Sequence, residues 1–404
     1  MKILINSYWC APGLASEPGV AWEYIERLSK THKIGLITGT EYKSILENTK
    51  IPNLKIYFIK NKFHLMISKL IPYRNITVVL SGIYHYYWQL KAFLFVLFSK
   101  KIKNEKYEIF HHLSSFSWRW PPVICLLYKN SIWGPAGGGQ DIPRAFLKDF
   151  NFYFRRTRRI LQFLSGYDFI NNICMHKLKI ILCANTDTFL KIKKKHHNKC
   201  RILLETALDS TAQYSCRELN DRNNLVYAGS LIPLKGVKYA ISAMQTVSKY
   251  KPDCILHIIG DGREMQNLKM QARDLNLDHN IIFHGRINSA EIKQFYKTAD
   301  LFIMPSLQET SGNATLEALS WGVPVIGFNN GGTRDIIQDS YNGYLVQVND
   351  MAEAVAAMAS AIIRILKNNT LYKTLSQNAI QTIKDKYLWS DKIKILEHIY
   401  SSMI

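Results

Sequence analysis

The chain has 404 residues, with 52 Lys and Arg against 31 Asp and Glu and a formal net charge of +21. Its length predicts two or three domains, and a content of 47% hydrophobic and 21% charged residues excludes disordered and low-complexity proteins. The charge is uneven, because residues 1–200 hold 31 basic and 11 acidic side chains, whereas residues 201–404 hold 21 and 20. The basic excess therefore indicates a charged surface on the first half.

The cysteines and the hydropathy pattern argue against disulfide-stabilised, zinc-stabilised, secreted and membrane-spanning proteins. The seven cysteines form no C-x-x-C pair, so a disulfide framework or a structural zinc site is disfavoured and a reducing cytoplasm is expected. The start, Met1–Ser7, has too short an apolar run for a signal peptide. The most hydrophobic stretch, Leu90–Phe98, is far shorter than the roughly 20 residues that a membrane-spanning helix needs. We therefore expect no transmembrane helix.

The first half begins with a β-α-β pattern. A strand over Lys2–Ser7 is followed by a turn-rich loop, a helix from about Val20 to Lys30 and a strand over Lys33–Thr38, which is typical of a doubly wound sheet. Further strands are predicted at Leu54–Ile59, Ile109–His112, Ser131–Trp133 and Lys179–Ala184. Between them, Lys60–Lys106 is aromatic and basic, with only Glu105 as an acidic residue.

The second half repeats this alternation more regularly. Strands are predicted at Asn224–Ala228, Ile255–Gly260, Asn280–His284, Leu301–Met304, Pro324–Gly327 and Gly343–Val346. Helices are predicted at Val237–Tyr250, Arg263–Leu275, Ser289–Thr298, Ala314–Trp321 and Met351–Leu366. The polar stretch from Lys191 to Asp221 is a plausible boundary. The fold class predicted is α/β, with two Rossmann-like doubly wound domains facing a cleft.

The densest functional signal follows the strand that ends at Met304. Residues 305–317 form a polar turn and then a helix that begins near Asn313. The open amides of such a helix start suit a phosphate or diphosphate. Glu309 and Glu317 flank this turn and could accept hydrogen bonds from sugar hydroxyls. A capped helix with an ordinary solvated glutamate is the alternative.

Three weaker patterns also follow strands. In Tyr227–Gly236, a glycine loop leads to Lys235 at a helix start, where the ammonium could stabilise a leaving diphosphate, although a solvated lysine is the commoner explanation. Ile258–Gly262 could meet a base, and Gly331–Asp335 could equally be a simple turn.

Taken together, these segments resemble the retaining glycosyltransferases of family 4, which have the GT-B fold. The resemblance rests on Glu309-x7-Glu317, on 321–326, on Gly331-Gly332 and on 342–346, and it covers about residues 224–346. The first half agrees more loosely. Its segments 16–22, 111–121 and 133–139 contribute, and the last two resemble a subgroup used in bacterial polysaccharide assembly.

The resemblance implies that the chain consists of two domains and a final helix. Residues 1–208 would be an acceptor-binding Rossmann-like domain and residues 209–385 a nucleotide-sugar-binding one. Residues 386–404 would be a final helix that packs back on the first domain, which fits the apolar periodicity from Trp389 to Tyr400.

The resemblance also assigns roles by position. Lys235 would hold the donor diphosphate, Glu317 the ribose and Glu309 the transferred sugar, while His111 would position sugar or phosphate oxygens at the reacting centre, with His112 as the fallback. The remaining donor-binding candidates are Gly19, Gly229, Ser230, Arg286, Ile287, Ser311, Gly312, Asn313 and Ala314.

One position departs from the family pattern. The family usually has an arginine directly after the glycine at 229, and this chain has Ser230. Lys235 would then neutralise the diphosphate without that arginine, unless Arg119, Arg334 or another residue replaces it.

The chemistry implied is displacement of a nucleoside diphosphate from an anomeric carbon with retained configuration. Transition-state charge would be stabilised by positioned groups. The family works without a metal, and no Asp-x-Asp metal motif is present, so neither a metal nor another cofactor is expected. Because no carboxylate nucleophile is identifiable for double displacement, front-side attack is the preferred mechanism.

The basic half predicts an anionic membrane surface as a partner. Its clusters are Lys60–Lys106, Arg155–Arg159 and Lys191–Lys195, interleaved with aromatic residues such as Phe63, Tyr73, Tyr87, Phe98 and Tyr153. A basic, aromatic surface suits an anionic leaflet. Single-stranded nucleic acid is the competitor, but no nucleic-acid module is visible and none is expected to bind. A solvated basic face over an aromatic core is the simplest alternative.

The sequence thus predicts a peripheral-membrane glycosyltransferase on the cytoplasmic face. It would transfer a sugar from a nucleotide-sugar to a lipid-linked or oligosaccharide acceptor in bacterial surface polysaccharide synthesis. An inactive scaffold of the same fold, suggested by Ser230, and a nucleotide-sugar epimerase are the alternatives.

Overall fold

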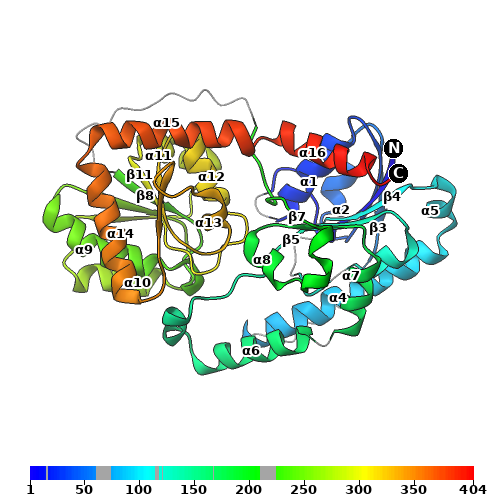
Figure 1. The fold of residues 1–404 in the computed structure, drawn as a ribbon, viewed down its shortest axis with the longest axis horizontal. Coiled ribbons are helices and arrows are strands. Elements are labelled where there is room, and N and C mark those ends of the chain that lie inside the picture. The colour runs from blue at the N-terminus through cyan, green and yellow to red at the C-terminus, as the bar shows by residue number, and fades with distance from the viewer. Residues whose placement is uncertain (15–16, 61–73, 114–117, 121, 167, 210–223) are drawn as a thin grey trace. The chain divides into compact units, whose positions relative to one another are not determined.

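The computed structural model describes residues 1–404 except 15–16, 61–73, 114–117, 121, 167 and 210–223. The chain divides into two compact units (Figure 1). Unit 1 consists of Met1–Gly139, Phe152–Glu205 and Ile393–Ile404, and unit 2 consists of Gln140–Asn151 and Thr206–Lys392. The chain therefore passes between the units more than once, whereas the sequence predicted continuous ranges.

Unit 1 is built on a parallel sheet of seven strands in the order β3-β2-β1-β4-β5-β6-β7. The strands are β1 (Lys2–Asn6), β2 (Lys33–Thr38), β3 (Leu54–Phe58), β4 (Ile109–His112), β5 (Ser131–Ala136), β6 (Ile180–Cys183) and β7 (Cys200–Ile202). The central strands β4 and β5 are buried along their whole length. Such strands are covered on both faces, which is the general property of parallel sheets.

Among its described residues, unit 1 also contains several α-helices and two short 3-10 helices. They are α1 (Glu17–Leu28), α2 (Lys43–Glu47), α4 (Arg74–Phe98), α5 (Lys100–Glu105), α6 (Phe152–Gly166), α7 (Phe169–Lys177), α8 (Thr186–Lys191) and the short 3-10 helices η1 (Val123–Leu127) and η3 (Lys194–Lys199). A core cluster joins Trp88 of α4 to Trp133 of β5 and Phe110 of β4. Burial of these aromatic side chains stabilises unit 1.

The last helix, α16 (Trp389–Ser401), begins in unit 2 and belongs to unit 1 from Ile393 onward. Within unit 1, Glu397 accepts a hydrogen bond of 2.8 Å from the Thr31 hydroxyl, and Tyr400 is fully buried beside His111.

Unit 2 is built on a six-stranded parallel sheet in the order β10-β9-β8-β11-β12-β13. The strands are β8 (Asn224–Ala228), β9 (Ile255–Ile259), β10 (Ile281–Gly285), β11 (Leu301–Met304), β12 (Val325–Phe328) and β13 (Gly343–Val346). From β8 the chain adds β9 and β10 towards one edge of the sheet. It then returns to place β11 on the other side of β8 and adds β12 and β13 towards the opposite edge. Strands β8 and β11 therefore form a topological switch point, where ligands bind in open α/β sheets.

Helices pack on both faces of the second sheet (Figure 1). They are α9 (Val237–Tyr250), α10 (Met265–Asp274), α11 (Ser289–Thr298), α12 (Asn313–Ser320), α13 (Gly331–Ile336), α14 (Met351–Leu366) and α15 (Asn369–Lys386), with the 3-10 helices η2 (Arg144–Asp149) and η4 (Pro233–Lys235). Helix α14 packs along α9, and α15 packs against α12. Asn288 and Asp350 cap α11 and α14 through their side chains.

The structure confirms the predicted α/β class and the two Rossmann-like sheets. The stretch Lys191–Cys200, predicted as part of a domain boundary, instead contains η3 and the start of β7 within unit 1. Residues 210–221 of that predicted boundary lie outside the described residues, as do Phe63 and Tyr73. Among the described ranges, no helix is long and apolar enough to cross a membrane.

Candidate functional site

The candidate site of unit 2 lies where the chain leaves the two strands of the switch point. The loop after β8 carries Gly229 and Ser230 and ends in Lys235, and the loop after β11 carries Glu309. Because β8 and β11 are neighbouring parallel strands, their carboxyl ends meet at one edge of the sheet. The topology therefore brings two segments about 75 residues apart in sequence to one place.

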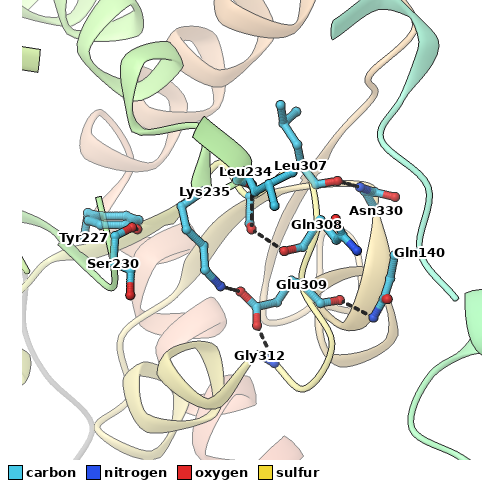
Figure 2. Close-up of polar contacts among 11 residues, drawn as sticks. Gln140, Tyr227, Ser230, Leu234, Lys235, Leu307, Gln308, Glu309, Gly312 and Asn330 are labelled. Atoms are coloured by element: carbon cyan, nitrogen blue, oxygen red, sulfur yellow. Dashed lines mark hydrogen bonds and ion pairs between the residues drawn. The ribbon is translucent and has the colours of Figure 1, made fainter. Parts of the chain in front are cut away.

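Lys235 and Glu309 form an ion pair across the two loops (Figure 2). The ammonium Nζ lies 2.5 Å from the carboxylate Oε2, and the two side chains are 23% and 13% exposed. The other carboxylate oxygen, Oε1, accepts a long hydrogen bond of 3.4 Å from the Gly312 amide. Both charged groups are partly shielded from water, which strengthens their interaction with a bound ligand. Both also keep some exposed surface, so a charged ligand could take the place of either side chain in the pair.

Backbone contacts hold the two loops together. The Leu234 carbonyl accepts the Leu307 amide at 2.9 Å and the Gln308 amide at 3.3 Å. Gly236 has φ +63°, and a Cβ there would lie 2.0 Å from the Pro305 carbonyl oxygen. Only glycine fits such a close approach in a left-handed conformation. These backbone contacts therefore keep the loops of Lys235 and Glu309 close to each other.

Helix α12 begins beside this pair. Gly312, at φ +61°, precedes its first turn, and no side chain caps it. The amides of Asn313 and Ala314 lie in that first turn, where helix amides and the helix dipole favour an anion. The structure thus places Gly312, Asn313 and Ala314, with Ser311 directly before them, on the same loop as Glu309.

Glu317 lies one turn into α12. Its Oε2 accepts a hydrogen bond of 3.1 Å from the Tyr296 hydroxyl of α11. Surrounding protein raises the pKa of Glu317 by desolvation, against the opposing effects of the Tyr296 hydrogen bond and the Lys293 charge. The residue still keeps exposed surface. Glu317 is therefore held by one neighbour and remains accessible to a hydroxyl ligand.

The loop after β8 is shaped by Tyr227 (Figure 2). This fully buried side chain donates a hydrogen bond of 3.1 Å to the Ser230 carbonyl. Burial, together with the Glu309 charge, raises the pKa of Tyr227 well above its ordinary value, so the phenol stays neutral. Two arginines were considered as substitutes for the charge that Ser230 lacks. Arg334 lies on α13 of unit 2 with Nε 3.8 Å from Asp335, and Arg119 lies in unit 1.

Arg286 and Ile287 follow β10, two strands from β8. They lie at the same edge of the sheet but not among the contacts of the Lys235–Glu309 pair. The Gly260 amide bonds the Gly285 carbonyl at 2.8 Å, which links the loops after β9 and β10. The assignment of Arg286 and Ile287 to a nucleobase stays a prediction.

In unit 1, His111 is fully buried and both of its ring nitrogens are hydrogen-bonded. Nε2 lies 2.7 Å from the Gly134 carbonyl and Nδ1 lies 2.6 Å from the Tyr400 hydroxyl. Since a carbonyl only accepts, Nε2 carries the proton and Nδ1 accepts from Tyr400. Burial lowers the pKa of His111 to about 4. A contact between His111 and a sugar or phosphate would therefore have to break one of these two bonds, which does not fit the expected role.

His112, the fallback position, lies in a different buried network. Its Nε2 is 3.3 Å from the amide nitrogen of Gln89, which is also 3.3 Å from Nε2 of His85. The Gln89 oxygen accepts from Asn6 at 3.0 Å. The Gln89 amide thus donates to both imidazoles, and His112 carries its proton on Nδ1. Burial lowers the pKa of His112 well below its usual range.

Gly19 lies in the first turn of α1. A Cβ there would lie 1.8 Å from the Leu14 carbonyl oxygen. Position 19 therefore requires a glycine because the Leu14 carbonyl lies so close. That a ligand approaches Gly19 stays a prediction.

Sequence reasoning missed three residues of this region: Gln140, Tyr296 and Asn330. The Gln140 amide donates to the Glu309 carbonyl at 2.9 Å, and the Asn330 amide donates to the Leu307 carbonyl. The sequence feature that pointed to this region was Gly331-Gly332. A Cβ at Gly331 would lie 2.3 Å from the Glu309 carbonyl oxygen, and a Cβ at Gly332 would lie 2.3 Å from the Thr310 carbonyl oxygen. Among the described residues, no three His, Cys, Asp or Glu side chains are grouped to hold a metal ion.

Part of the chain is similar in sequence to known proteins. Residues 215–382 match the family model for glycosyl transferases group 1. Over 188 residues the chain is 28% identical to the UDP-Gal:alpha-D-GlcNAc-diphosphoundecaprenol alpha-1,3-galactosyltransferase of Escherichia coli, covering 45% of this chain and 47% of that protein. An uncharacterized glycosyltransferase of Methanocaldococcus jannaschii is 28% identical over 181 residues, 45% of each chain. The matches thus span a little under half the length of these relatives.

Solved structures resemble the whole chain. HepE from Anabaena, solved in complex with UDP, has a TM-score of 0.67 at 15% identity over 100% of both chains. Sucrose-phosphate synthase from Thermosynechococcus elongatus has a TM-score of 0.68 at 15% identity, over 100% of this chain and 98% of that one. At 15% sequence identity, this similarity establishes the fold alone. Residues 215–382 thus match the glycosyl transferases group 1 model, and the chain has the two-domain GT-B fold of these solved structures.

Proposed function

We propose that the chain is a retaining glycosyltransferase that transfers a sugar from a nucleotide-sugar to a lipid-linked or oligosaccharide acceptor in bacterial surface polysaccharide synthesis. The observation that carries the proposal is the Lys235–Glu309 ion pair beside the uncapped start of α12. It offers a cation and helix amides to a diphosphate, and a carboxylate to a sugar, at the switch point of the sheet.

The ion pair suggests how the donor is received. A diphosphate placed on the α12 amides would draw the Lys235 ammonium away from Glu309, 2.5 Å distant. Lys235 would then stabilise the charge that develops as the diphosphate leaves. The released Glu309 carboxylate would accept hydrogen bonds from the sugar hydroxyls, and Glu317 would accept one from the ribose. In this scheme no metal or other cofactor takes part.

Retention by front-side attack is part of the proposal. Glu309, the carboxylate next to the predicted sugar position, has one oxygen on Lys235 and the other on the Gly312 amide. These partners favour a carboxylate that binds and orients over one that attacks the anomeric carbon. The acceptor hydroxyl would then approach from the face that the diphosphate leaves.

The similar proteins support the donor and acceptor classes. The Escherichia coli relative is named for transfer from UDP-Gal to a diphosphoundecaprenol-linked sugar, and HepE has been solved with UDP and glucose. We extend both classes to this chain as a proposal: a nucleoside-diphosphate sugar and a glycan on a lipid carrier.

A transfer assay tests the function. Purified full-length protein is incubated with UDP-, GDP- or ADP-sugars, with and without a diphospholipid-linked sugar, and the released nucleoside diphosphate and the glycosylated lipid are measured. Transfer in the wild type is expected. Binding of the donor without turnover would favour the inactive scaffold suggested by Ser230, and an isomerised sugar without consumption of acceptor would favour the epimerase.

We further propose that unit 1 docks on an anionic membrane surface, as a peripheral protein. On α4, Tyr87, Leu90, Leu94 and Phe98 recur at helical spacing, and each is 43–73% exposed. On α6, Phe152 and Tyr153 are 59% and 73% exposed beside the exposed Arg155, Arg156 and Arg159. Apolar and aromatic side chains next to arginines match an interface of anionic headgroups over acyl chains.

Vesicle flotation tests this docking. Wild-type protein is expected to float with vesicles that contain anionic lipid and to be released by salt, and Leu90→Glu with Leu94→Glu should weaken flotation. Ile282→Glu, an exposed apolar residue of unit 2, is the matched control. Flotation that ignores lipid charge, or that the α4 substitutions leave unchanged, would contradict this surface.

A further inference from the structure

Residues 140–151 connect two parts of unit 1 but belong to unit 2. Gly139 before them and Phe152 after them are both in unit 1. We call this segment the strap. It contains the 3-10 helix η2, and Gln140, Ile142, Phe146 and Phe150 of the strap are buried. With these buried side chains the strap is an anchored segment, and Gln140 and Phe146 make contacts within unit 2.

The first residue of the strap holds the Glu309 loop. Gln140 is 1% exposed, and its amide Nε2 donates a hydrogen bond of 2.9 Å to the Glu309 carbonyl (Figure 2). The same carbonyl accepts the Gly332 amide at 2.8 Å. Two donors on one carbonyl fix the orientation of the peptide plane after Glu309, and with it the direction in which the side chain leaves the loop.

The other end of the strap holds the helix that follows Lys235. Phe146 packs edge-on against Tyr239 of α9, with ring centroids 4.9 Å apart, and against Phe328 at 5.5 Å. Asp149 accepts a hydrogen bond from the Tyr239 hydroxyl and lies 2.9 Å from the Lys238 ammonium. Lys238 and Tyr239 lie in the first turn of α9, directly after Lys235 and Gly236.

We propose that the strap is a positioning element for the Lys235–Glu309 pair, with Gln140 as its positioning residue. One end of the strap fixes the loop of Glu309, and the other fixes the helix start next to Lys235. The segment thereby sets the approach of the two charges, although neither charge belongs to it. The effect of the strap on catalysis rests on the proposed function. Its effect on the structure rests only on the contacts within unit 2.

The test replaces Gln140 in two ways in the full-length protein. Gln140→Leu keeps the volume of the side chain and removes the donor, and Gln140→Glu replaces the donor with an acceptor. Asn280→Leu is the matched control, because the buried Asn280 amide also donates to backbone carbonyls of unit 2, those of Pro252 at 2.7 Å and Cys254 at 2.9 Å.

Hydrogen exchange gives a readout that needs no activity. In Gln140→Leu, the amides of 307–312 and 332 should exchange about tenfold faster than in the wild type, because one hydrogen bond to the Glu309 carbonyl is lost. The same amides should be unchanged in Asn280→Leu. Equal effects in the two variants, or no acceleration in Gln140→Leu, would overturn the strap's role.

Kinetics then separates positioning from simple destabilisation. We expect kcat for transfer to fall about tenfold in Gln140→Leu with a small change in KM for the donor. In Gln140→Glu, kcat should recover as the pH falls, since the introduced buried carboxyl donates again once it is protonated. A pH profile parallel to that of the wild type would contradict this. If the wild type itself shows no transfer, the proposed function fails while the exchange experiment still decides on the strap.

Discussion

The two units place charge in opposite ways. Unit 1 contains most of residues 1–200, which carry a net charge of +20. Its buried imidazoles on β4 and α4 are nevertheless neutral, because burial lowers the pKa of His111 to about 4 and that of His85 to about 3. Residues 201–404 carry a net charge of only +1, yet unit 2 concentrates a lysine and a glutamate in a partly buried pair at its switch point. Net charge therefore indicates the surface that a unit shows to partners, and buried pairs indicate where a unit can do chemistry.

The largest effect should come from the cation of the unit 2 pair. Lys235→Ala is expected to lower transfer by about 100-fold or more, since a positioned charge on a leaving group contributes that much in comparable sites. Lys249→Ala, at an exposed position of the same helix region, should have no effect. Steady-state rates with a matched donor and acceptor measure both. Equal activity of the two variants would remove Lys235 from the site.

The close approach of the two loops should be the next most sensitive feature. Gly236→Ala forces a Cβ to within 2.0 Å of the Pro305 oxygen at φ +63°. We expect a loss of about 2–3 kcal/mol in unfolding free energy. Gly285→Ala also has a positive φ, +68°, but open space around it, and should cost about 1 kcal/mol. Urea denaturation compares the two, and identical losses would show that the contact with Pro305 is not limiting.

A smaller, pH-dependent effect is expected at Glu17 in unit 1. Burial, and then the Glu205 charge, raise the pKa of Glu17 to about 8. A carboxyl whose folded pKa exceeds its unfolded value stabilises the fold below the unfolded pKa and loses that stabilisation as the pH rises to about 8. Glu17→Gln should therefore gain stability relative to the wild type between pH 5 and pH 9. Thermal melts across this range check it, and a pH-independent difference would contradict the assignment.

The smallest expected change concerns the last helix. Tyr400→Phe removes the hydroxyl that bonds His111 at 2.6 Å inside unit 1. The buried Nδ1 then loses its partner, which should cost about 1–2 kcal/mol. Tyr250→Phe, at an exposed tyrosine of unit 2, is the control. A wild-type melting temperature for Tyr400→Phe would mean that α16 does not depend on this bond.

The sequence predicted the sheets well because their strands are short apolar runs between turn residues. The predicted and observed bounds coincide at Lys33–Thr38, Ile109–His112 and Leu301–Met304. The family resemblance assigned Lys235 and Glu309 to one donor site, and in the structure the two side chains form an ion pair. The 25-residue helix α4 and helix α15 were not predicted from the basic and polar patterns of those regions.

Long-range contacts account for what the sequence could not show. Gln140 lies 169 positions from Glu309, and a single glutamine in a loop carries no local sign of its partner. His111 was assigned to the reacting centre by resemblance, but it lies on a central strand that is buried along its whole length. Residue type indicated chemistry, and only the fold distinguished a side chain at the site from one inside the core.

The most direct test of the central claim follows the anomeric carbon. Full-length protein is supplied with a nucleotide-sugar of defined anomeric configuration and a diphospholipid-linked sugar acceptor, and the product linkage is determined by nuclear magnetic resonance. We predict release of one nucleoside diphosphate for each sugar transferred, with the configuration of the donor retained and with the reaction dependent on Lys235. An inverted linkage, or the absence of transfer and of donor hydrolysis with UDP-, GDP- and ADP-sugars alike, would contradict the proposed function.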